Sequence, residues 1–191
     1  MLRRNFAATV GSLLLSACAT SHSPQQEFFA ALSAQCGKSF EGRLVSTDDA
    51  DKALAEQRLV MEVRACTDDE IKIPFHVGEN RSRTWVVTRT NEGLRLKHDH
   101  RHEDGTSDKV TMYGGDSVSE GSSTRQEFPV DAYSIDLFTR EGLAPSVTNV
   151  WAIEATPALF AYELRRENRF FRVEFDLTAP VSAPPPPWGS N

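Results

Sequence analysis

Three of the five histidines in the chain lie close together, in the segment His98-Asp99-His100-Arg101-His102. In a β-strand alternate side chains share a face, so we expect the three imidazoles to point the same way. Imidazoles with this spacing can bind Zn²⁺ or a similar divalent ion, which would activate water in a hydrolase or lyase. The segment also runs into Asp104-Gly105, a hairpin-turn signal, and polar residues beside a turn often form a solvated or hydrogen-bonded network. Both interpretations remain open at the level of the sequence.

A second cluster is Arg81-Ser82-Arg83-Thr84-Trp85. Its arginines can bind a carboxylate or phosphate through paired hydrogen bonds, or they can balance the carboxylates of the chain itself. Aromatic side chains such as Trp85 fit either a packed core or the wall of a ligand cavity. The predicted ligand-binding residues are Arg83, Trp85, His98, His100, Tyr113 and Trp151. The sequence identifies no catalytic residue, because Gly114-Gly115-Asp116-Ser117 lacks the Gly-x-Ser-x-Gly elbow of serine hydrolases.

These candidates fall in segments with a two-residue hydrophobic period, which is typical of β-strands. The pattern predicts about nine or ten short strands at hairpin spacing. They begin near residues 40, 59, 71, 85, 94, 110, 147, 159 and 170. No β-α-β alternation is present, so we expect a mainly β fold, an antiparallel up-and-down barrel of about eight to ten strands rather than a Greek-key sandwich. A short N-terminal helix is predicted from Ser23-Pro24 to Gly37. The pattern leaves 46–57 open between loop and helix, and 131–141 between strand and helix.

The start of the chain has the form of a bacterial export signal. Arg3 and Arg4 precede an apolar stretch over 6–15, which is too short to span a bilayer as a helix. The following Leu15-Ser16-Ala17-Cys18 resembles the bacterial lipoprotein signal, in which the cysteine is lipidated. Ala17-Cys18-Ala19 is also a site for ordinary signal peptidase, which would release a soluble periplasmic or secreted protein.

The lipoprotein interpretation predicts a signal peptide over 1–17, a lipid on Cys18 and a tether over 18–23. Residue 19 is Ala rather than Asp, which favours the outer membrane, with the protein facing the periplasm. The membrane partner would then be reached through the lipid on Cys18, because several acyl chains together anchor a protein stably.

Export would also place the two remaining cysteines in a compartment where they can bond to each other. In an oxidising compartment Cys36 and Cys66 are expected to form a disulfide. The chain has 21 basic and 27 acidic residues and a net charge of −6, with no basic block, which argues against a nucleic-acid partner. We assign residues 24–178 to one barrel domain and residues 179–191, which contain Pro184–Pro187, to a disordered tail.

Three stretches between Arg83 and Gly115 carry a resemblance to a known group of proteins. They are Arg83-Thr84-Trp85-Val86-Val87-Thr88, the run from Gly93 to Gly105, and Tyr113-Gly114-Gly115. This region resembles uncharacterised secreted proteins and lipoproteins of proteobacteria, and the similarity continues more loosely to Phe175-Asp176. The succession of strands is also similar to the lipocalin-like (calycin) barrels, although Phe40-Glu41-Gly42-Arg43 lacks the tryptophan of their Gly-x-Trp motif.

The strand pattern and the export signal together predict a non-enzymatic, membrane-tethered protein that binds a small apolar or amphipathic ligand. One alternative is a metal-binding protein or metal-dependent hydrolase or lyase centred on His98 and His100, with zinc as the cofactor. Another is a structural envelope lipoprotein whose proline-rich tail contacts other proteins. The sequence names neither the ligand nor a protein partner.

Overall fold

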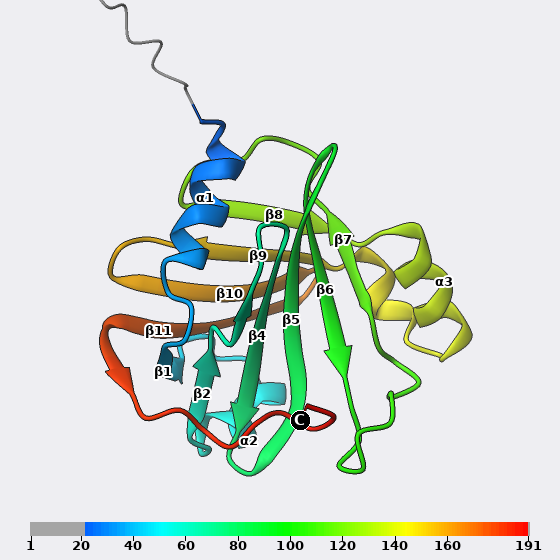
Figure 1. The fold of residues 1–191 in the computed structure, drawn as a ribbon. Helices are drawn as coiled ribbons and strands as arrows, with labels where there is room; N and C mark the ends of the chain where they lie inside the picture. The colour runs from blue at the N-terminus through cyan, green and yellow to red at the C-terminus, as the bar shows by residue number, and fades with distance from the viewer. Residues whose placement is uncertain (1–21, 191) are drawn as a thin grey trace, which may run out of the picture.

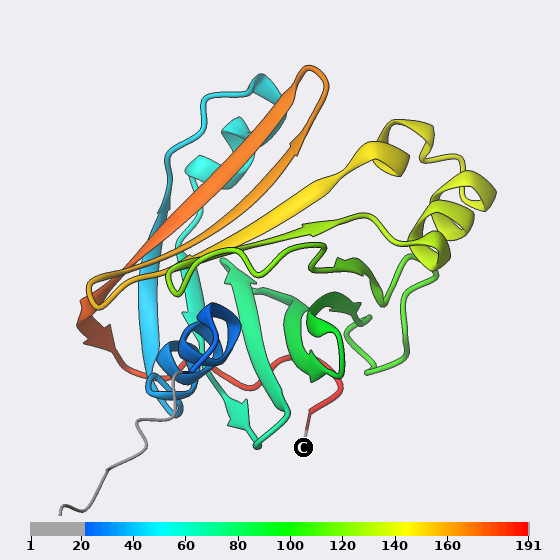
Figure 2. The same cartoon turned by 90° about the horizontal axis from the view of Figure 1, so that it is seen from above.

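The strands form one antiparallel sheet that curls into a nearly closed barrel (Figures 1 and 2). The structure, a computed structural model, describes residues 22–190. The strands within this range are β1 (Ser39–Leu44), β2 (Leu59–Glu62), β3 (Ala65–Cys66), β4 (Glu70–Val77), β5 (Asn80–Thr90), β6 (Gly93–His100), β7 (Tyr113–Asp116), β8 (Arg125–Pro129), β9 (Val150–Ala155), β10 (Leu159–Arg166) and β11 (Arg169–Val181). Their order in the sheet is β7-β6-β5-β4-β2-β1-β11-β10-β9-β8, with β3 beside β4.

This order confirms the predicted up-and-down topology. Strands that follow each other in the chain are paired in the sheet, and β1 pairs with β11, so the first and last strands lie side by side. The remaining gap lies between β7 and β8. The predicted signal peptide over 1–17 and the predicted lipidation site Cys18 lie outside the described residues. Among residues 22–190, no helix combines the length and hydrophobicity that a membrane crossing requires.

Helix α1 (Pro24–Ser33) is the first described element and packs over one end of the barrel interior (Figure 1). Its start follows the sequence signal, because the Ser23 hydroxyl accepts from the Gln26 N–H and the Gln26 side chain accepts from the Ser23 N–H. The Gln25 side chain donates to the Ser117 hydroxyl, which also accepts from the Leu94 N–H just after the β5–β6 turn, so the helix lies near this turn. Three side chains of α1 are buried in the core, namely Phe28, Phe29 and Leu32.

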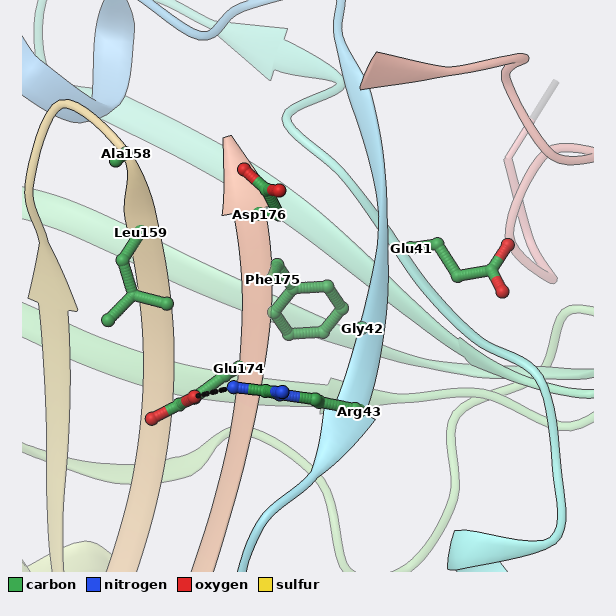
Figure 3. A pocket seen from close by; sticks show the side chains of 8 residues that line it. All are labelled: Glu41, Gly42, Arg43, Ala158, Leu159, Glu174, Phe175 and Asp176. Carbon is green, nitrogen blue, oxygen red and sulfur yellow. Dashed lines mark hydrogen bonds and ion pairs between the residues drawn. The ribbon is translucent and has the colours of Figure 1, made fainter. Parts of the chain in front are cut away.

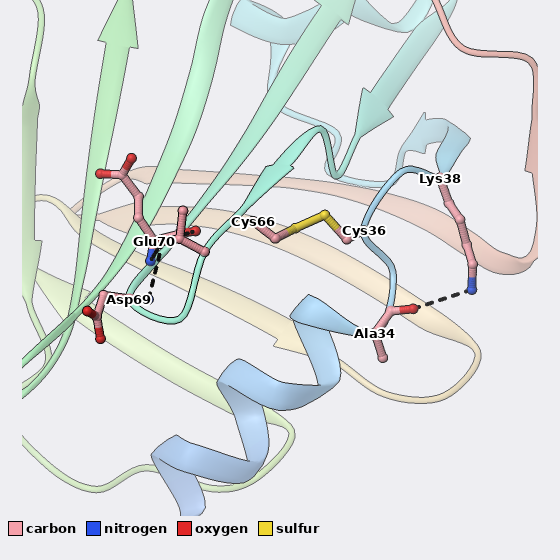
Figure 4. The surroundings of a disulfide bond; sticks show 7 residues. Ala34, Cys36, Lys38, Cys66, Asp69 and Glu70 are labelled. Carbon is pink, nitrogen blue, oxygen red and sulfur yellow. Dashed lines mark hydrogen bonds between the residues drawn. A yellow bond between two sulfur atoms is a disulfide. The ribbon is translucent and has the colours of Figure 1, made fainter.

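The predicted disulfide is confirmed, and it connects α1 to the sheet (Figure 4). Cys36 and Cys66 are bonded, with their Cα atoms 6.3 Å apart and a sequence separation of 30. A loop of this length contributes roughly 3–4 kcal/mol in the chain-entropy description. The strand expected from residue 59 onward is interrupted, so that Cys66 lies in the separate strand β3. β2 and β3 both pair with β4, and at the interruption the Gly37 N–H donates to the Val63 carbonyl at 2.7 Å.

Helix α3 (Ala132–Arg140) settles the segment that the sequence left open. Asp131 caps it by accepting from the Ser134 N–H, and Leu137 and Phe138 are buried. Figure 2 shows α3 beside the barrel, away from α1. The Ser134 hydroxyl donates to the Gly114 carbonyl, so the start of α3 bridges the gap between β7 and β8.

Strand β7 begins at Tyr113 rather than near residue 110 as predicted, and it contains Gly114 and Gly115. A Cβ atom on Gly114 would lie 1.9 Å from the Leu96 carbonyl oxygen, and one on Gly115 would lie 1.7 Å from that of Pro129. Only glycine permits these approaches of one backbone to another. The Gly-Gly pair therefore brings β7 toward the end of β8, where the barrel nearly closes.

The end of the chain also differs from the predicted disordered tail over 179–191. β11 continues to Val181, which pairs with Ser39 of β1. Beyond it, the Arg81 guanidinium donates to the Pro186 carbonyl at 2.9 Å, and the Trp188 N–H donates to the Arg81 carbonyl at 3.1 Å. A polyproline segment cannot pair in a sheet, but its carbonyls still accept hydrogen bonds, and the segment lies against the barrel.

Candidate functional site

A cavity of about 180 Å³ lies inside the barrel, at the end away from α1. It is formed where β5 begins and β6 ends, whereas α1 packs near the turn that joins these strands. Its aromatic wall consists of Phe75, Trp85, Tyr113, Tyr162 and Phe171. Its polar and charged lining consists of Asp51, Arg83, Thr84, His98, His100 and Arg169.

Strand parity explains why these residues meet. Arg83 and Trp85 are two apart on β5 and face inward, and their partners across the β5–β6 ladder are His100 and His98. Trp85 and His98 are buried, whereas Arg83 and His100 are half-buried. The cavity therefore has a buried floor and a partly exposed mouth.

A short segment lies along the mouth. The 3₁₀ turn η1 (Asp49–Asp51) and helix α2 (Lys52–Ala55) supply Asp51 and Leu54 to the lining. Arg169 donates to both oxygens of Asp51, at 2.7 and 2.6 Å, and to Asp48 at 2.8 Å. These bonds hold the segment against β11.

Hydrogen bonds connect the tyrosines and histidines of the cavity. His98 Nδ1 lies 3.1 Å from the Tyr113 carbonyl, which can only accept, so Nδ1 carries the proton. His98 Nε2 is then the acceptor for the Tyr162 hydroxyl at 2.8 Å. The Tyr113 hydroxyl lies 3.1 Å from His100 Nε2. The polar groups that line the cavity are thereby fixed in orientation.

Burial keeps this network uncharged. It lowers the pKa of His98 to about 3, and burial together with the charge of Arg83 lowers the pKa of His100 to about 4. Burial also raises the pKa of Tyr113 to about 12 and the pKa of Tyr162 well above its ordinary value. At neutral pH these four side chains offer hydrogen bonds but no charge.

The predicted zinc site at His98, His100 and His102 is not formed. β6 ends at His100, so His102 lies beyond the strand and is exposed. Both ring nitrogens of His98 are occupied by hydrogen bonds. Across residues 22–190, no group of three or more His, Cys, Asp or Glu side chains is arranged to hold a metal ion. The alternative, a hydrogen-bonded network at the end of a strand, describes His98 and His100.

The predicted ligand-binding residues come together, with one exception. Arg83, Trp85, His98, His100 and Tyr113 all line the cavity. Trp151 does not, because it is fully buried behind His98, with ring centroids 5.1 Å apart.

The predicted set of ligand-binding residues did not include Tyr162, Phe171, Asp51 or Arg169. Tyr162 and Phe171 lie on β10 and β11, and their two-residue alternation indicates an inward face but not the depth at which each side chain sits. Asp51 lies in the segment left open between loop and helix. Arg169 lies at the predicted start of the last strand, and its pairing with Asp51 joins residues 118 positions apart.

A larger depression lies on the outer surface (Figure 3). It measures about 390 Å³ and lies over Gly42 and Phe175, where β1 and β11 are paired. A Cβ atom on Gly42 would lie 2.5 Å from the Phe175 ring, so this ring already fills the space that a side chain at position 42 would need. Its arginine, Arg43, pairs with Glu174 at 3.2 Å. The depression therefore offers neither an enclosed apolar wall nor an uncommitted cation.

Comparison with protein-family models, curated proteins and solved structures finds no match for this chain.

Proposed function

We propose that this protein is a non-enzymatic binding protein of the cell envelope, which holds a small apolar or amphipathic molecule in the barrel cavity. The observation that supports it is the cavity itself. Protein interiors are close-packed, and space that persists between aromatic walls and a few fixed polar groups is the usual form of a small-molecule site.

The tether belongs to the same proposal. Lipidation of Cys18 would hold the barrel at the outer membrane, facing the periplasm, and export is the condition under which the Cys36–Cys66 disulfide is stable. Membership of the secreted proteobacterial group that the sequence resembles is part of this proposal too.

The cavity can be tested by filling it. Leu164 lines the cavity from β10, whereas Leu159, on the same strand, faces the outer depression. Leu164→Trp should block the space, and Leu159→Trp should leave it open. Native mass spectrometry and solvent extraction of protein purified from a bacterial envelope should recover a small molecule from the wild type and from Leu159→Trp, but not from Leu164→Trp.

Circular dichroism checks that both variants are folded. Equal amounts of the same molecule in all three proteins would place it outside the cavity and overturn the proposal. Incorporation of a fatty-acid analogue tests the tether separately, because loss of the label in Cys18→Ser is expected only if Cys18 is lipidated.

A further inference from the structure

The charged side chains that line the cavity differ in whether they form an ion pair. Three charged side chains line it, namely Asp51, Arg83 and Arg169. Asp51 and Arg169 neutralise each other, at 2.6 Å between Arg169 Nη2 and Asp51 Oδ1. No carboxylate within residues 22–190 lies within 4.0 Å of the Arg83 guanidinium, which donates one hydrogen bond, at 3.2 Å, to Asn80 Oδ1. A guanidinium has five N–H donors, so most of those on Arg83 remain available.

Arg83 lies beside a flat aromatic wall. Trp85 stacks on Tyr162 with ring centroids 4.5 Å apart and an interplanar angle of 22°, and on Phe75 at 4.8 Å and 12°. All three of these side chains are less than 10 % exposed. Since Arg83 and Trp85 are two residues apart on one strand face, a cation stands at the mouth directly above the aromatic floor.

The size of the cavity limits the ligand. A cavity of about 150 Å³ accommodates benzene, and sites for drug-sized molecules begin near 300 Å³. At about 180 Å³ the space fits one ring with a short substituent and is too small for a long acyl chain.

We propose that the cavity binds a small aromatic carboxylate, with its ring against Trp85 and Tyr162 and its carboxylate on Arg83. This inference rests on the proposed binding function and narrows it to one ligand class. Arginine and carboxylate form two parallel charge-assisted hydrogen bonds.

Calorimetric titration with a matched pair of probes tests the inference. Phenylacetate and 2-phenylethanol have nearly the same shape, and only phenylacetate is charged. The full-length protein, purified from a bacterial envelope in mild detergent, should bind phenylacetate at least tenfold more tightly than 2-phenylethanol. Arg83→Gln should remove this preference while 2-phenylethanol still binds. Arg43→Gln, an exposed arginine on the outer surface, should keep the preference.

The indole signals of ¹⁵N-labelled protein show that each variant is folded and whether Trp85 senses the probe. Equal affinities for the two probes in the wild type, or a preference that survives Arg83→Gln, would overturn the carboxylate inference and leave the binding function standing. Binding of laurate but of neither probe would overturn the inference of an aromatic ligand and would also leave the binding function standing. If none of the three binds and the indole signals do not change, both proposals fail.

Discussion

The two ends of the barrel interior differ in how they are filled. At one end α1 inserts Phe28, Phe29 and Leu32, which are at most 5 % exposed, and the space is filled. At the other end α2 is a single turn with no buried residue, and it lies along the mouth of a cavity instead of filling it. Burial of apolar surface stabilises the first end, and a fixed polar network occupies the second.

This difference indicates that one end of the barrel provides stability and the other provides the candidate site. The end that carries the packing also carries the disulfide, which connects the residues following α1 to β3. The end with the cavity contains tyrosines and histidines that are buried or half-buried. They cost free energy to desolvate, and hydrogen bonds within the cavity satisfy them. Substitutions at the filled end should therefore act through lost packing, and substitutions at the cavity end should act through hydrogen bonds and the response to pH.

The largest effect is expected at the filled end. Leu32→Ala removes a side chain that is 1 % exposed and leaves a void, so it should lower the free energy of unfolding by about 2–5 kcal/mol. Urea denaturation followed by tryptophan fluorescence measures this, and probe binding at the cavity should be retained. A loss below 1 kcal/mol would show that α1 does not contribute to the core as described.

Acid should act on the cavity end. Because the pKa of His98 falls from 6.5 to about 3 on folding, the unfolded chain binds more protons below pH 6.5, and stability falls as the pH drops toward that value. This histidine alone should account for about 1.4 kcal/mol per pH unit between pH 6 and 4.5. His76 and His100, whose pKa values are lowered to about 4 mainly by burial, add to the same slope.

Denaturant midpoints measured across this pH range test the assignment. His98→Gln should show a shallower slope than the wild type, and His102→Gln, at an exposed position, should match the wild type. Equal slopes for His98→Gln and the wild type would mean that His98 is not held neutral by burial.

A smaller effect is expected from Tyr162→Phe. It leaves His98 Nε2 without its donor at 2.8 Å, and a buried acceptor without a partner costs about 1–3 kcal/mol. Tyr133→Phe is a suitable control, because Tyr133 is 51 % exposed and its hydroxyl donates only at 3.4 Å. Thermal unfolding compares the two, and equal melting temperatures would contradict the network.

The smallest effect is expected from Leu54→Ala. Leu54 is half-buried at the cavity mouth, where little packing is lost, so the cost should stay below about 1 kcal/mol. It is the same substitution as Leu32→Ala, and chemical denaturation of both in parallel compares the two ends directly. A cost equal to that of Leu32→Ala would remove the distinction between them.

Local patterns were enough to predict the strand succession, the capped helix at Ser23-Pro24 and the Cys36–Cys66 pair. Alternation and capping depend on near neighbours in the chain, and two cysteines in an oxidising compartment usually pair. Strand parity also placed Arg83 and Trp85 on one face. The three-dimensional fold determines where β6 ends, which separates His102 from His98 and His100, so that within residues 22–190 the three predicted zinc ligands do not come together. It also decided the depth of each inward residue, so that Trp151 lies in the core and Tyr162 in the cavity wall. Depth and closure depend on contacts between residues far apart in the chain, and no local period encodes them.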